Sequence, residues 1–270
     1  MEMRAGPAGE GAIGMRSEVT IRVAVRDGVS YLASSYFTPP FKVANITEDK
    51  RELFLHLMLM CSSPGVLDGD EQMIRVGVAA NGRLHLHTQS YQRLFQMRNG
   101  AVQRMEVRLG RGAFFCWLPH PCVPHAHSIF AGRNKIFLEE GCQLIWGEVL
   151  TCGRKGNGEV FALSRYHMRT EVFVGEELVL LENVYLQPAV VPVEAMGQME
   201  GFTHQASLLW VGGRVEEKRV LIEAELEGVA GIMYGVSEGP VGSLVIRLLG
   251  NGAELLYDTL KMIAEICKQS

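Results

Sequence analysis

The stretch VTIRVAVRDGVSYLASSYF, residues 19–37, contains the pattern that decides the fold class. Its first half alternates apolar and polar residues, which is the two-residue period of a half-buried β-strand. The apolar positions that share one face are Val19, Ile21, Val23 and Val25. Asp27-Gly28 follows, and this dipeptide between two alternating runs predicts a β-hairpin. The stretch MIRVGVAANGRLHLHTQS, residues 73–90, repeats the design with Asn81-Gly82, so we expect a second hairpin there.

Short strand-like segments dominate the rest of the chain, and helical spacing is confined to its last quarter. We expect further strands at residues 53–60, 103–109, 113–118, 135–138, 143–151 and 160–163, and at 167–186 with a break at Gly175-Glu176. Apolar residues at three- and four-residue steps predict helices at 216–228 and 253–269. Closely spaced strands separated by Gly, Pro and Asn are typical of a mainly β protein.

Length and composition predict one globular domain. The chain has 270 residues, of which 47% are apolar, and its formal net charge is −4. We expect a flexible N-terminal tail at residues 1–15, in which GEGAIG (9–14) lacks the strand and helix of a dinucleotide site, and one domain at 16–270. Without a basic run, a secretion signal or a long apolar segment, we expect neither nucleic-acid nor membrane binding. The location predicted is the cytoplasm, with the six cysteines reduced.

The stretch HPCVPHAHS, residues 120–128, holds the atoms of a metal site. Its candidate ligands are His120, Cys122, His125 and His127. The spacing is not that of a closed zinc site, which typically pairs two cysteines and then two histidines. The histidines of a plain loop, exposed or satisfied by local hydrogen bonds, are the alternative. A Cys122–His125 nucleophile and base lacks an identifiable orienting group.

Three acidic residues are candidates for a different kind of metal contact. Asp70 follows a Pro-Gly turn in SPGVLDGD (63–70), and Glu148 and Glu182 lie inside the apolar runs QLIWGEVLTCG (143–153) and LVLLENVYL (178–186). A carboxylate in such a run is costly unless it is paired, hydrogen-bonded or facing water. Either these acids occupy solvated turns and strand faces, or they line a water-filled interior. Periodicity alone leaves both readings open.

Seven motifs, in order along residues 17–270, resemble those of the UreD/UreH family of urease accessory proteins. They are YFTPPFKV (36–43), SPGVLDGDEQMIRVGV (63–78), LHTQSYQRLF (86–95), AFFCWLPHPCVPHAHSIFAGRNKIFL (113–138), LIWGEVLTCGRKGNGEVF (144–161), LLENVYL (180–186) and GFTHQASLLWV (201–211). HPCVPHAHS departs from the family pattern, because many relatives carry aromatic, aliphatic or acidic residues at His120 and His125.

The resemblance implies a non-enzymatic nickel-delivery chaperone. Family members bind the accessory protein UreF and, through it, the GTPase UreG, and the assembly docks on the urease apoprotein. The implied fold stacks β-sheets somewhat like a β-helix, adds two α-helices and encloses a polar tunnel for nickel. No cofactor is held tightly, and Ni²⁺ is a transient cargo. The tunnel residues transferred by the motifs are Asp70, Glu148, Glu182, Thr88, Gln89 and Ser90.

Two other functions remain open on the residues alone. Two carboxylates at a suitable separation on a β scaffold could act on carbohydrates as acid and base. The His/Cys loop could instead store metal, which would require tight stoichiometric binding.

Overall fold

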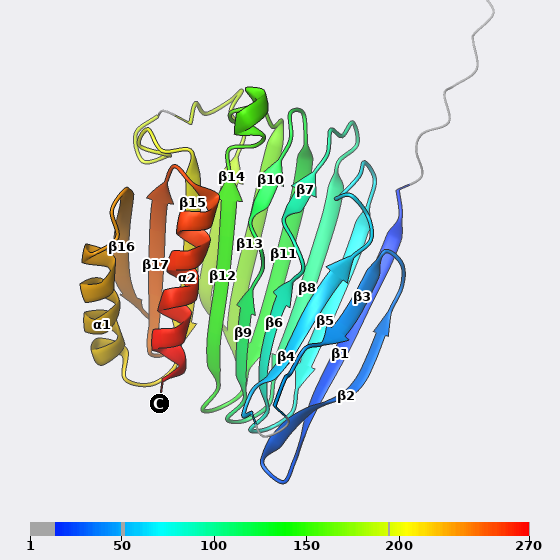
Figure 1. Ribbon diagram of the computed structural model, residues 1–270, viewed down its shortest axis with the longest axis vertical. Helices are drawn as coiled ribbons and strands as arrows, with labels where there is room; N and C mark the ends of the chain where they lie inside the picture. Colours follow the sequence, from blue (N-terminus) through cyan, green and yellow to red (C-terminus); the bar gives the residue numbers. More distant parts are fainter. Residues whose placement is uncertain (1–13, 50–51, 194, 270) are drawn as a thin grey trace, which may run out of the picture.

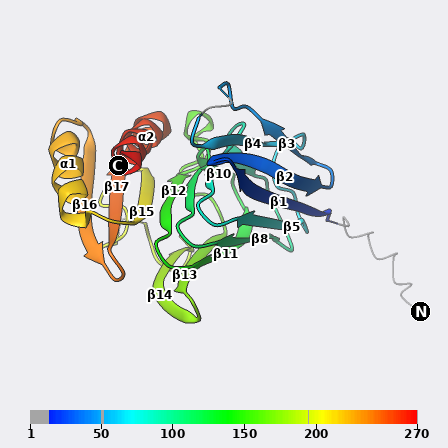
Figure 2. The same cartoon turned by 90° about the horizontal axis from the view of Figure 1, so that it is seen from below.

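The computed structural model describes residues 14–49, 52–193 and 195–269, and within them two β-sheets face each other (Figures 1 and 2). The predicted tail at 1–15 and the GEGAIG motif lie outside the described residues, except for Gly14 and Met15. We call the two layers sheet A and sheet B. Sheet A has the strand order β14 (Glu177–Leu186), β13 (Arg165–Val174), β11 (Ile129–Leu138), β8 (Ala101–Leu109), β5 (Glu71–Val78), β1 (Arg16–Arg26) and β2 (Val29–Phe37).

Sheet B is longer and carries the helices. Its order is β16 (Ile232–Gly239), β17 (Ser243–Gly250), β15 (His204–Val211), β12 (Gln143–Thr151), β9 (Phe114–Leu118), β6 (Arg83–Thr88), β4 (Leu55–Cys61) and β3 (Phe41–Asn45). The short strand β10 (Cys122–Pro124) pairs with β12 and with β7 (Gln92–Leu94). A 3₁₀ turn spans Lys155–Asn157, and the helices α1 (Val215–Glu227) and α2 (Ala253–Lys268) lie beside β15–β17 (Figure 1).

The chain coils between the two sheets. From β4 to β13 it passes repeatedly from one sheet to the other, so that neighbouring strands within each sheet run parallel from β1 to β13 in sheet A and from β4 to β12 in sheet B. Among the strands described, antiparallel pairs flank these parallel blocks on both sides. The predicted fold class is confirmed: mainly β, with stacked sheets resembling a β-helix and two helices in the last quarter.

The Asp27-Gly28 hairpin is confirmed, whereas the one expected at Asn81-Gly82 is wrong. β1 and β2 pair in antiparallel fashion, and Asp27 and Gly28 have φ values of 51° and 78°. These are the left-handed values that a two-residue hairpin turn requires. At Asn81-Gly82 the chain instead leaves β5 in sheet A and enters β6 in sheet B. A tight turn therefore joins two sheets here rather than two paired strands.

Most other expected elements are present, with differences at their ends. The segment 160–163 forms bends rather than a strand, and β11 begins six residues before the expected start. The helices agree with the spacing within one residue at each end. In α2 the apolar residues Leu256, Leu260 and Ile263 pack onto sheet B, whereas Leu255 is exposed.

The core has two main layers because sheet B is covered on both faces. Between the sheets lie side chains such as Ile21, Val107 and Leu144. Between sheet B and the helices lie others, including Leu208 and Ile263. Seen from below, both helices cover the outer face of sheet B (Figure 2). No helix among the described residues is both long and apolar enough to cross a membrane.

Candidate functional site

Two cavities lie along the inner face of β12. Cavity 1 has a volume of about 200 Å³, and its polar lining includes Gln72, Gln103, Thr88, Gln89, Ser90, Asn134 and Glu148. Cavity 2 has a volume of about 250 Å³, and its polar lining includes Glu148, Glu182, Gln198, Gln205, Ser207 and Arg247. The walls of both contain Glu148, Val149 and Tyr166. Glu148 is therefore the carboxylate that the two cavities have in common.

Glu148 is positioned by the alternation of β12 and by polar side chains around it. It shares its strand face with Trp146, whose indole Nε1 donates a hydrogen bond of 2.9 Å to Glu148 Oε1. The amide of Asn134, from β11 of the opposite sheet, donates a second bond of 3.1 Å to the same oxygen. Burial raises the pKa of Glu148 to about 7, and the charge of nearby Glu182 acts in the same direction. The carboxyl is therefore poised between its two protonation states near neutral pH.

Glu182 also lines cavity 2, and its carboxylate is ion-paired. Arg247 Nη2 on β17 donates to Glu182 Oε2 on β14 at 2.7 Å and to its Oε1 at 3.0 Å. The Glu182 side chain is 24% exposed and that of Arg247 is 61% exposed. Glu148 and Glu182 also line a small void of about 20 Å³ with Trp146 and Thr170. The structure thus brings together two of the three predicted acids.

The predicted hydroxyl segment lies at the end of β6, in the wall of cavity 1. Thr88 Oγ1 accepts a hydrogen bond of 2.8 Å from the backbone N–H of His120 and lies 3.3 Å from its Nδ1. The His120 ring packs against Tyr257 of α2, with ring centroids 4.9 Å apart. Gln89 and Ser90 are exposed, so this end of the cavity lies close to solvent.

Asp70 has a different environment from the other predicted acids. Its two carboxylate oxygens accept hydrogen bonds from the backbone N–H groups of Met15 at 3.0 Å and Leu67 at 2.9 Å. The side chain is buried, but it is absent from the described walls of cavities 1 and 2. Asp70 therefore holds the turn before β5 to the start of β1.

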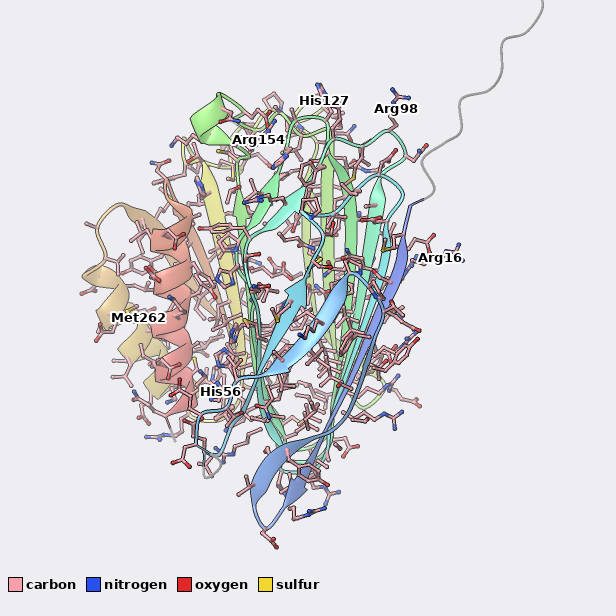
Figure 3. The ribbon with its side chains drawn as sticks, turned by 45° about the vertical axis from the view of Figure 1, so that its right-hand side comes forward. Arg16, His56, Arg98, His127, Arg154 and Met262 are labelled. Atoms are coloured by element: carbon pink, nitrogen blue, oxygen red, sulfur yellow. The ribbon has the colours of Figure 1, made fainter. Side chains whose placement is uncertain are left out.

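The four candidates of HPCVPHAHS do not converge. His120 lies at cavity 1, and Cys122 is buried in β10, where burial raises the pKa of its thiol. His125 is buried against Phe95, with ring centroids 4.8 Å apart, and burial lowers its pKa. His127 is exposed at one end of the molecule, where Figure 3 labels it. Within the described ranges, no three His, Cys, Asp or Glu side chains form a preformed metal centre.

Several cavity residues escaped the sequence analysis although a signal existed for some of them. Gln72 and Asn134 are buried on strand faces that otherwise carry no polar side chain. A polar side chain within such an alternating apolar set is as informative as an acid in an apolar run, because it needs a partner or water. Arg247 gave no signal, since an exposed arginine in a strand is ordinary.

The arrangement defines a class of β protein in which two facing sheets, built by a coiling chain, enclose polar cavities around a carboxyl group. Residues 15–270 match the family described as "UreD urease accessory protein". The chain belongs to this family. It is 45% identical over 252 residues to the urease accessory protein UreD of Flavobacterium johnsoniae, covering 92% of this chain and 91% of that protein.

More distant relatives agree over nearly the whole length. The chain is 37% identical to the urease accessory protein UreD of Acetivibrio thermocellus, covering 94% of this chain and 97% of the relative. It is 30% identical to the urease accessory protein UreH of Helicobacter pylori strain G27, with coverage of 90% and 91%. The relatives are named as accessory proteins, which favours a non-catalytic role.

Proposed function

We propose that this protein is a cytoplasmic nickel-delivery chaperone in urease maturation, which guides Ni²⁺ through its interior from cavity 1 to cavity 2 by way of Glu148. Ni²⁺ is a cargo that moves through the protein and is not a resident cofactor. The path includes Thr88, Gln89 and Ser90 at one end, Glu148 at the centre and Glu182 at the other end. Asp70, which lies outside both cavity walls, stays a prediction as a residue of the path.

The observation that carries the proposal is the position of Glu148 in the walls of both cavities. A single carboxylate attracts a divalent cation, but it cannot complete its coordination shell. The other polar groups around Glu148 are mainly amides and hydroxyls, which are weaker ligands, and the carboxylate of Glu182 is held by Arg247. A conduit needs contacts that favour entry without holding the ion, and this lining has that character.

We propose further that the protein docks a UreF-type accessory protein and, through that complex, a UreG-type GTPase and the urease apoprotein. Two features support this part: the names of the relatives, which are urease accessory proteins, and the helices α1 and α2, which both lie over the outer face of sheet B (Figures 1 and 2). The helices cover the outer face of sheet B, whereas Glu148 and Glu182 line cavity 2 between sheet B and the edge strand β14, so docking at one face and ion transfer at another are compatible.

The test is activation of urease apoprotein at limiting nickel by the purified accessory proteins with wild-type chain, Glu148→Gln or Glu182→Gln. Glutamine keeps the size of each side chain and removes its charge, so we expect at least a several-fold loss of activation with an intact partner complex. Glu106→Gln is the matched control, because Glu106 pairs with Arg108 on the outer face of sheet A. Wild-type activation by both cavity variants would refute the interior path.

A further inference from the structure

Three histidines form a row on the outer face of sheet B, next to α2. His56 on β4 and His85 on β6 are direct partners in the parallel register, and their ring centroids lie 5.2 Å apart. His87 is two residues further along β6 on the same face, with its ring centroid 5.5 Å from that of His85. His56 lies near the C-terminal end of α2, where Figure 3 labels it. We call His56, His85 and His87 the histidine row.

The central ring of the row has no hydrogen-bond partner. Both His85 Nδ1 and His85 Nε2 are buried from solvent, and neither has a partner among the described residues. A neutral imidazole carries one donor and one acceptor, and leaving both unsatisfied costs a few kcal/mol. Buried polar atoms in this state call for a water molecule or an ion. The two nitrogens of His85 are therefore available to bind a ligand.

The ring spacing suits a shared metal ion. An imidazole nitrogen binds a divalent transition metal at about 2.1 Å, so two rings that share one ion in a tetrahedral arrangement have centroids about 5 Å apart. The observed spacings are 5.2 Å and 5.5 Å. Rotations of the side chains would still be needed, because these rings do not already converge as a metal centre.

The electrostatic state of the row suits metal binding as well. Burial lowers the pKa of all three histidines, that of His85 to about 3, so the rings are neutral at pH 7 and their lone pairs are free. Lys268 lies close enough to oppose a cation, but its Nζ is paired with Glu265 at 2.7 Å. On the other side, Glu52 Oε2 lies 3.5 Å from His56 Nε2 and offers an anionic oxygen.

We propose that the histidine row binds one divalent transition-metal ion of borderline softness on the exterior of the protein. The site lies beside the end of cavity 1 that is close to solvent. Imidazole is a preferred ligand for such ions, including Ni²⁺. The row ends next to Thr88, which follows His87 and lines cavity 1 together with His120. The identity of the physiological ion as Ni²⁺ rests on the proposed function, whereas the site itself does not.

The test is calorimetric titration of the purified chain with NiCl₂ at pH 7.5. The variants are His56→Gln, His85→Gln and the double variant His85→Gln/His87→Gln. His167→Gln is the matched control, because His167 lies on the outer face of sheet A and bonds to Asn183. We expect one site in the wild type and in the control, and at least tenfold weaker binding in each row variant. Thermal unfolding of every variant shows whether it is folded.

Wild-type nickel affinity in both His85→Gln and His56→Gln would overturn the proposal. His56 decides the matter if the His85 variants fail to fold, since its side chain is 31% exposed and tolerates substitution more readily. Titration of Glu148→Gln separates this inference from the proposed function. Retained binding in that variant together with normal urease activation would refute the interior path and leave the histidine row intact. Wild-type nickel affinity in the row variants together with impaired activation by Glu148→Gln would refute the histidine row and leave the interior path intact.

Discussion

Arg247 on β17 donates hydrogen bonds to both carboxylate oxygens of Glu182 on β14, and this ion pair joins sheet B to the edge of sheet A. The pair lies in the wall of cavity 2, opposite Glu148. The positive charge of Arg247 offsets the negative charge of Glu182. Without Arg247, the charge of Glu182 would act more strongly on the carboxyl of Glu148. The ion pair therefore couples the edge of the two sheets electrostatically to the carboxyl of Glu148.

Replacement of Arg247 by glutamine tests this coupling. Because the Arg247 side chain is 61% exposed, we expect a loss of no more than about 1 kcal/mol in the free energy of unfolding. The uncompensated Glu182 should also raise the pKa of Glu148 further. The fluorescence of Trp146, which donates to Glu148, reports this ionisation as a function of pH. Arg108→Gln, on the outer face of sheet A, is the control; an unchanged titration midpoint in Arg247→Gln would show that the two sites are independent.

Glu148 gives the protein a specific pH dependence of stability. Its pKa is raised from 4.5 to about 7 in the folded protein, so the native state holds a proton that the unfolded chain releases. The stabilising contribution is complete below pH 4.5 and is lost as the pH rises through 7, by at most about 3 kcal/mol. Denaturant unfolding of wild type and Glu148→Gln between pH 4.5 and 8 measures it. We expect the variant to gain stability relative to wild type as the pH rises, and a constant difference would contradict the assignment.

Asp70→Asn should destabilise the fold through the turn before β5. The asparagine amide cannot accept both backbone N–H groups that bond to the carboxylate of Asp70. We expect a loss of about 2 kcal/mol in the free energy of unfolding, measured by denaturant titration. Glu71→Gln is the neighbouring control, since its partner Arg16 is exposed and the pair contributes little. Equal stabilities of the two variants would mean that the Asp70 bonds are not structural.

Cys61 offers a way to obstruct cavity 1 chemically. Of the six cysteines, all described, it is the exposed one, and it lines this cavity. We expect one thiol to react rapidly with a maleimide in the folded protein, and labelling to reduce urease activation at limiting nickel. Partial desolvation raises the pKa of the Cys61 thiol, so the rate should increase above pH 8. Cys61→Ser is the insensitive control; full activation by the labelled wild type would place the ion path elsewhere.

The sequence predicted the local elements better than it predicted which strands pair with each other. Asp27-Gly28 and Asn81-Gly82 look alike as turns, yet only the first joins strands of one hairpin. The difference depends on parallel partners far along the chain, such as β8 for β5, and local alternation carries no information on them. The same limit applied to the site. Glu148 and Glu182 were conspicuous as acids in apolar runs, but the pairing of Glu182 with Arg247, across 65 residues, was not predictable.

The raised pKa of Glu148 has a consequence for charge balance. Near neutral pH this carboxyl carries a proton for part of the time, and a metal ion that binds it must displace that proton. In each molecule whose Glu148 is protonated, an arriving Ni²⁺ would release one proton, so the enclosed interior would gain one positive charge rather than two. The buffer would take up this fractional amount of proton on arrival of the metal and return it on departure, because the free carboxylate is protonated again.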